Sequence, residues 1–153
     1  MRGGWGGYGA AMTVAEMIAS NPAEPVLDPT ALRDAIEAAL ECASTCSACA
    51  DACLAEDMVA DLRTCVRRNL DCADVCAATA KVLSRQVAAD LGFLRVLLEA
   101  CTVACKTCAS ECEDHAPMHP HCAVCAESCR RCEAACRALL EALREQTHQP
   151  GVR

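Results

Sequence analysis

The chain has 153 residues, of which 16 are cysteines and only 2% are aromatic, and its formal net charge is −7. This length suits one domain, but aromatic rings, which usually supply much of a core's buried area, are too few to fill this one. The acidic balance argues against nucleic acid as a partner, because phosphates are bound through an excess of Lys and Arg. No apolar run approaches the roughly 20 residues of a membrane span, so no membrane partner is expected.

Residues 1–27 are interpreted as a leader ahead of the main domain. Residues 1–9 read MRGGWGGYG, which predicts a flexible stretch without the apolar core of a secretory signal or the paired arginines of twin-arginine export. Residues 10–20 are mildly apolar around Glu16 and predict a short amphipathic helix. We therefore expect a cytoplasmic protein, in which thiols stay reduced.

Four long segments of helical character follow, with Gly and Pro nearly confined to their ends. The first begins at Asp28, an N-cap followed by proline at the first helical position, and extends to about Leu54. The others span about 58–86, 88–113 and 121–146, and residues 149–153 form a tail. Short connections force neighbouring helices to run antiparallel. The predicted fold is all-α: an antiparallel up-down-up-down four-helix bundle over residues 28–148, with a short extra N-terminal helix.

The cysteines recur at helical spacing. The first and third segments share a 4-3-4 spacing, the fourth has 3-4-3-4, and the second is sparser. At about 100° per residue, such cysteines lie on one face of each helix. They lie late in the first and third segments and early in the second and fourth, so an antiparallel bundle gathers them in one half. They are Cys42, Cys46, Cys49, Cys53, Cys65, Cys72, Cys76, Cys101, Cys105, Cys108, Cys112, Cys122, Cys125, Cys129, Cys132 and Cys136.

The other half continues these faces with ordinary apolar residues. In the first segment, Leu32, Ile36 and Leu40 lie on a flank that either residues 10–20 or a partner subunit would cover. Asn69 interrupts the cysteine face of the second segment and is predicted to pack and form hydrogen bonds. The remaining apolar core is expected from Leu83, Val87, Leu91, Leu94, Leu97, Leu98, Leu140 and Leu143.

Buried thiols at this density predict metal binding. Filling space is a weak explanation, because Ala, Leu and Val do so without oxidative risk. Disulfides need β-carbons about 3.5–4.5 Å apart, whereas helical residues four apart hold them about 5–6 Å apart. With metal–sulfur bonds of about 2.3 Å, a two-coordinate ion holds its sulfurs at most ~4.6 Å apart, which a CxxxC pair can reach. Seven such pairs occur: Cys42/Cys46, Cys49/Cys53, Cys72/Cys76, Cys101/Cys105, Cys108/Cys112, Cys125/Cys129 and Cys132/Cys136.

Copper(I) fits this pattern better than other thiophilic metals. Thiolates select copper(I), zinc or iron–sulfur clusters. Structural zinc takes four ligands, commonly from knuckles in turns, and clusters use C-x2-C-x2-C runs in loops. On straight helix faces we expect no point surrounded by four sulfurs. One copper(I) per thiolate leaves the 16 thiolates neutral, whereas one per pair leaves about eight negative charges buried. We expect multiple copper(I) ions, about one per cysteine.

The two connections at the cysteine end carry further candidate ligands. Met58 and Asp61 are predicted to lie on the Cys65 face, and the loop between the third and fourth segments is rich in histidine. Imidazole and thioether bind copper more weakly than thiolate, which suits transient sites at the mouth of the bundle. The candidates there are Met58, Asp61, His115, Met118, His119 and His121.

These helical CxxxC arrays resemble those of the bacterial four-helix-bundle copper storage proteins, over about residues 30–146. The resemblance implies copper(I) held along the bundle axis, a mouth lined by His or Met, a homotetramer and the cytosolic type of the family. The expected function is storage and sequestration of copper(I), supplied by an unidentified donor such as a copper chaperone, and not catalysis. Thiol oxidoreductases instead use one CxxC pair. The alternative is a zinc or general heavy-metal thiolate buffer, similar to metallothionein.

Overall fold

The structure is a computed structural model that describes the backbone of residues 10–148 and the side chains of residues 13–146. Its elements in chain order are α1 (Ala10–Ala19), α2 (Pro29–Leu54), the 3-10 helix η1 (Val59–Leu62), α3 (Arg63–Leu83), α4 (Leu91–His115) and α5 (Pro120–His148). The flexible leader predicted at residues 1–9 and the tail predicted at 149–153 lie outside the described residues.

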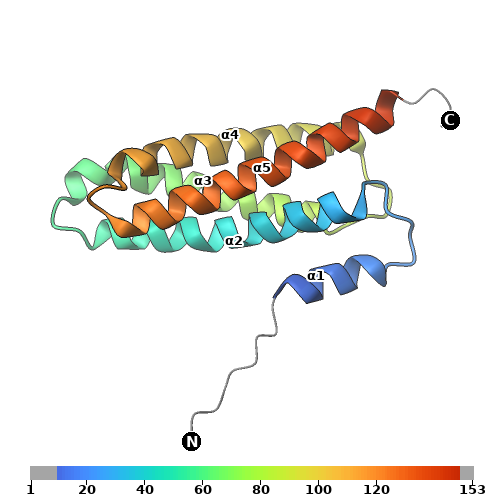
Figure 1. Cartoon of the computed structure of the whole chain (residues 1–153), viewed down its shortest axis with the longest axis horizontal. Coiled ribbons are helices and arrows are strands. Elements are labelled where there is room, and N and C mark those ends of the chain that lie inside the picture. The colour runs from blue at the N-terminus through green and yellow to red at the C-terminus, as the bar shows by residue number, and fades with distance from the viewer. Residues whose placement is uncertain (1–9, 149–153) are drawn as a thin grey trace, which may run out of the picture.

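Helices α2 to α5 form the predicted antiparallel four-helix bundle (Figure 1). Each helix packs on two neighbours, in the order α2, α3, α4, α5 and back to α2. The α2–α3 and α4–α5 connections lie together at one end, and the α3–α4 connection lies at the other. The short α1 lies outside the bundle, along α2. Over the residues described, no helix is both long and apolar enough to cross a membrane.

The helix starts follow from side-chain caps. Asp28 Oδ1 accepts a hydrogen bond from the backbone N–H of Ala31 at 2.8 Å, as the sequence predicts. Asp90 caps α4 in the same way, so that helix begins at Leu91 and not at about residue 88. Ala88, with φ of 54°, takes the left-handed conformation, which a helix cannot contain. Val87 therefore lies in a connection and is 74% exposed, which corrects its predicted place in the core.

The start of α3 also differs from the prediction. Residues 59–62 form the 3-10 helix η1, and the α-helix begins only at Arg63. A 3-10 helix has about three residues per turn, so Leu62, three residues before Cys65, takes the inward position and is buried. Asp61 and Met58 are exposed instead. The predicted alignment of these two residues with Cys65 is therefore wrong.

The end of the bundle away from the cysteines has an ordinary apolar core. Leu32 and Ile36 of α2 are buried in it, and Ile18 of α1 belongs to the same cluster. The flank of α2 is thus partly covered by α1, while Leu40 remains 44% exposed. The other buried leucines of this half are Leu27, Leu83, Leu94, Leu98, Leu139, Leu140 and Leu143.

Candidate metal site

The thiols fill the other half of the bundle as one continuous column. All 16 cysteines are buried and free, and the four long helices each contribute to the column. Neighbouring sulfurs lie 3.4–4.0 Å apart, from Cys101 and Cys136 at the deep end (3.7 Å) to Cys65 and Cys122 near the mouth (4.0 Å). A disulfide bond is about 2.05 Å long, so these are contacts between separate thiols. The predicted gathering of the cysteines in one half is confirmed.

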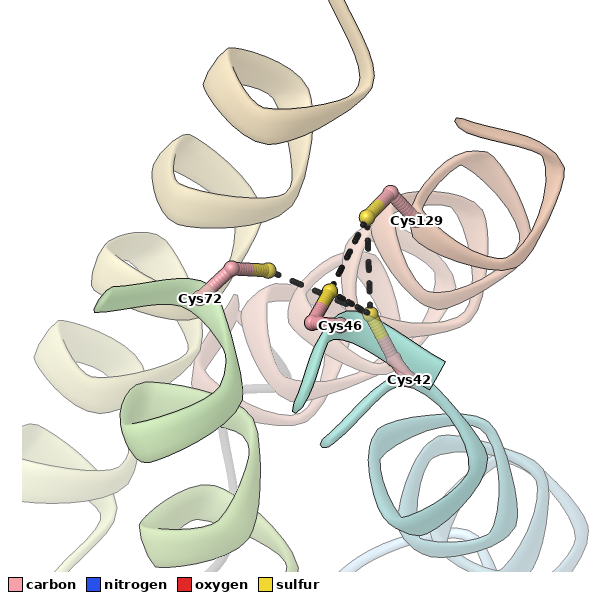
Figure 2. A group of neighbouring side chains, drawn as sticks. All are labelled: Cys42, Cys46, Cys72 and Cys129. Atoms are coloured by element: carbon pink, nitrogen blue, oxygen red, sulfur yellow. Dashed lines mark hydrogen bonds between the residues drawn. The ribbon is translucent and has the colours of Figure 1, made fainter. Parts of the chain in front are cut away.

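A group of four thiols in the middle of the column shows how the sulfurs converge (Figure 2). Cys42 and Cys46 come from α2, Cys72 from α3 and Cys129 from α5. The Cys46 and Cys129 sulfurs are 3.4 Å apart, and the Cys42 sulfur is 3.7 Å from Cys129 and 3.9 Å from Cys72. Three helices therefore aim their sulfurs at one small volume, which one ion or a small cluster can fill.

Groups of four sulfurs recur and overlap. Cys42 also belongs to a group with one cysteine from each of the other three helices, namely Cys76, Cys105 and Cys132. Cys46 and Cys129 likewise belong to a group with Cys108 and Cys125. Within each group the ligand atoms lie within 4.8 Å of one another. Shared sulfurs favour bridging thiolates over isolated sites with one ion each.

This geometry corrects one premise of the sequence analysis. We expected no point with four sulfurs around it, because each helix face is straight, but neighbouring helices supply the sulfurs that turns supply in zinc knuckles. Two of the CxxxC pairs have sulfurs in contact, at 3.7 Å for Cys42/Cys46 and 3.8 Å for Cys72/Cys76. Contacts between helices are as short as these. Geometry alone therefore does not exclude zinc as the bound metal. Charge and ligand softness must distinguish copper(I) from zinc.

Asn69 occupies the one place on α3 where the 4-3-4 spacing would put a further cysteine. It is fully buried, its Nδ2 donates to the backbone oxygen of Cys65 at 2.9 Å, and its Oδ1 accepts from the thiols of Cys125 at 2.9 Å and Cys108 at 3.4 Å. This matches the hydrogen-bonding role predicted for it. The amide thus joins thiols of three helices in the column.

Burial is the main cause of the raised pKa values among the metal-free thiols near the mouth. It raises the pKa of Cys53 to about 11, with the neighbouring Cys65 adding to the effect, and it raises the pKa of Cys122. Hydrogen bonds, that with Cys112 foremost, instead lower the pKa of Cys65. Cys65 also accepts from Cys53 and from Asn69 Nδ2. Burial thus raises the pKa of Cys53 and Cys122 while hydrogen bonds lower that of Cys65, so Cys65 loses its proton more readily than these two neighbours.

Three histidines line the mouth, but only one of them meets the thiols. The Nδ1 atom of His121 lies 3.5 Å from the sulfurs of Cys49 and Cys122 and 4.0 Å from that of Cys53. The ring of His119 lies 5.5 Å from that of His121, and the ring of His115 is 6.4 Å from that of His119. Cys49, Cys53, His121 and Cys122 form a candidate metal group at the column's outer end.

The two methionines and the aspartate predicted at the mouth lie at the same end but on its surface. Met58 is 58% exposed and Met118 is 66% exposed, and Asp61 is exposed in η1. His115 is not a member of the group that His121 forms with the thiols. Its Nε2 instead donates to Glu111 at 3.3 Å. Of the predicted mouth ligands, His121 therefore contacts the thiol column, whereas the methionines and Asp61 lie outside it.

One mouth residue escaped the sequence analysis. Glu56, in the α2–α3 connection, accepts hydrogen bonds from His121 Nε2 at 2.9 Å and from His119 Nδ1 at 3.0 Å. These bonds, that from His121 foremost, lower the pKa of Glu56. An acidic residue in a surface connection is common, so only its place opposite the histidine loop distinguishes it.

Comparison with known proteins agrees with this site. A copper storage protein from Streptomyces lividans, Ccsp, solved with 10 copper equivalents, is 50% identical, with a TM-score of 0.83 over 84% of this chain and 98% of that one. The Cu(I)-bound copper storage protein BsCsp3 is 32% identical, with a TM-score of 0.62 over 69% of this chain and 94% of that one. The uncharacterized cysteine-rich protein YhjQ of Bacillus subtilis is 34% identical over 86 residues, which are 56% of this chain and 74% of that protein.

The sequence profile of the copper storage protein family, Csp, matches residues 28–141. That range contains the bundle's 16 cysteines and the three mouth histidines. The chain therefore belongs to the copper storage protein family.

Proposed function

We propose that this protein stores copper(I) as a thiolate-bridged array inside the bundle, at a capacity of about one ion per cysteine, on the order of 16. The observation that carries the proposal is the sharing of sulfurs between groups: Cys42, Cys46 and Cys129 each belong to two groups of four. A sulfur that bridges two ions raises the number of ions that a fixed set of thiolates can hold.

Charge favours copper(I) over zinc in this column. A zinc ion with four thiolates leaves two negative charges per site, and such charges are costly in a buried, low-dielectric interior. One copper(I) per thiolate leaves none. Thiolates are soft ligands, which copper(I) accepts at low coordination number. The zinc buffer is therefore the less favoured alternative.

The proposed ligands are the 16 cysteines together with His121, whose Nδ1 atom faces three of them. Met58, Met118, His115 and His119 are proposed as weak contacts that copper meets on its way to the column. Asp61 is exposed and adds negative charge near the mouth. A weak site is useful there, because a tight one would hold the ion before it reached the thiols.

The working unit is proposed to be the bundle over residues 28–148, which performs no catalysis. A relative, the Streptomyces lividans protein, is described as a cytosolic copper storage protein, solved with five coppers, and we propose the cytosol for this chain too. A copper chaperone is the proposed donor. A homotetramer is proposed as well, because α4 carries an outward apolar stripe of Phe93, Val96 and Val103, which are 55–63% exposed.

An anaerobic titration tests the proposal. Reduced, metal-free protein is titrated with copper(I) against a calibrated chelator, and saturation is expected on the order of 16 ions per chain. Saturation at one to four ions would refute the array. In a second arm, copper(I) added to the zinc-loaded protein should release all of the zinc, whereas zinc retained in the presence of excess copper(I) would favour the general thiolate buffer.

A further inference from the structure

Glu56 joins the two connections at the mouth through a single oxygen atom. Its Oε1 lies 2.9 Å from His121 Nε2 and 3.0 Å from His119 Nδ1. Glu56 follows α2, whereas both histidines lie at the start of α5 or just before it. A carboxylate can only accept hydrogen bonds, so each ring nitrogen that faces it carries the hydrogen.

This assignment determines what His121 presents to the thiols. A neutral imidazole has one N–H and one nitrogen with a free lone pair. With the hydrogen on Nε2, the lone pair is on Nδ1, and Nδ1 is the atom 3.5 Å from Cys49 and Cys122. A metal ligand needs that lone pair. Glu56 therefore holds His121 in the tautomer that can bind an ion beside these sulfurs.

We propose that Glu56 is a positioning residue for copper(I) uptake, which fixes the tautomer and the ring orientation of His121. The proposal rests on the proposed function of the mouth site. Hydrogen bonds from metal-ligating histidines to carboxylates commonly have this effect, and their removal costs about 10–100-fold in affinity or activity. Without Glu56, a hydrogen on Nδ1 can be donated to the sulfur of Cys49 or Cys122, and copper must then displace it.

A second carboxylate at the same end provides a matched control. Glu111 accepts a hydrogen bond from His115 Nε2 at 3.3 Å. The group in which His121 meets Cys49, Cys53 and Cys122 does not include His115. Replacing Glu111 removes the same charge and a similar histidine contact, but it leaves the nitrogen that faces the thiols untouched.

The first test needs no copper. Long-range proton–nitrogen NMR of the reduced, metal-free protein reports the tautomer of each histidine. His121 should be the Nε2–H form in the parent, in Glu111→Leu and in Glu56→Gln, whose amide oxygen still accepts. Glu56→Leu, which keeps the volume but has no acceptor, should shift His121 toward the Nδ1–H form. An unchanged tautomer in Glu56→Leu would overturn the proposal.

The second test measures uptake by stopped flow. Glu56→Leu should take up the first copper(I) equivalents about tenfold more slowly, with Glu56→Gln and Glu111→Leu near the parental rate and saturation equal in all four proteins. Equal slowing in Glu56→Gln and Glu56→Leu would contradict a role through hydrogen-bond acceptance. A parent that saturates at one to four ions refutes the storage array instead, and the NMR result still decides the role of Glu56.

Discussion

The sulfur atoms of Cys46 and Cys129 lie 3.4 Å apart across the α2–α5 interface, although the two residues are 83 positions apart in the chain. Two metal–sulfur bonds of about 2.3 Å would hold a pair of sulfurs at most ~4.6 Å apart. The metal-free distance is shorter than that limit, so an ion can bridge this pair after small side-chain adjustments. Bridging this pair therefore needs no rearrangement of the two helices.

The metal-free, reduced protein is expected to be folded already. Zinc fingers need metal to fold because they lack a core, but here one half of the bundle is packed with leucine, and buried thiols behave as small hydrophobes. Far-ultraviolet circular dichroism should give nearly equal helix content before and after copper loading. A coil-like spectrum for the reduced metal-free protein would contradict this.

Access and capacity should respond to different substitutions. Replacing His115, His119 and His121 together by Ala should slow copper(I) uptake and its removal by a chelator, with saturation lower by no more than the few ions that they hold. His121→Ala alone should produce most of the effect, because its ring is the one in contact with thiols. Stopped-flow uptake is the measurement, and a triple variant that loads and unloads at the parental rate would exclude the role.

The residues chosen to test capacity, as a counterpart to the mouth histidines, lie deeper in the column. Replacing Cys46 and Cys105 by Ser should lower saturation, because Cys46 is shared between two groups of four sulfurs and Cys105 belongs to another. The initial uptake rate should stay close to the parental value, since the mouth is unchanged. Equilibrium titration and stopped flow on the same samples separate the two effects, and full capacity in this variant would argue against shared sulfurs.

The stability of the metal-free protein should fall at alkaline pH. Burial raises the pKa of Cys53 to about 11 and also raises that of Cys122, whereas an unfolded thiol has a pKa of about 8.5. Above that value the unfolded state loses its thiol protons first, so the stabilisation is complete below about pH 8.5 and declines as pH rises toward 11. Urea unfolding of reduced protein at several pH values measures this. A Cys53→Ala/Cys122→Ala variant should show a shallower decline.

The leucine half should govern stability without setting capacity. Leu98 is fully buried, and Leu98→Ala is expected to lower the free energy of unfolding of the metal-free protein by about 2–5 kcal/mol. Val96→Ala on the exposed face should change it by no more than about 0.5 kcal/mol. Copper(I) saturation should be the same in both variants. A marked loss of copper sites in Leu98→Ala would show that the two halves are coupled.

The apolar stripe of α4 should hold the proposed tetramer together. Phe93→Ser with Val103→Glu places polar and charged groups in this stripe, so the assembly is expected to dissociate. Val87→Ser, which alters an exposed residue of the α3–α4 connection, is the control. Light scattering during size-exclusion chromatography gives the mass of each. A tetramer that survives the double substitution would place the interface elsewhere.

Local periodicity was enough to predict the bundle and its thiol-lined half. The spacing of the cysteines determines a face within each helix, and short connections determine that neighbouring helices are antiparallel, so both features depend only on residues close in sequence. The cap at Asp28 was predictable for the same reason. The exposed Met58 and Val87 were not, because the 3-10 turn before Cys65 and the left-handed Ala88 break the helical periodicity on which their prediction relied.

Which sulfurs meet was decided only by the tertiary structure. The groups around Cys42 and Cys46 combine three or four helices, and their membership depends on how far each helix is shifted and rotated against its neighbours. The same holds for His121, which faces three thiols while His115 faces Glu111, and for Glu56, which lies 65 residues before its partner His121. Distances between residues far apart in the chain are set by the packing of the helices. The helical spacing of residues in the sequence therefore cannot predict them.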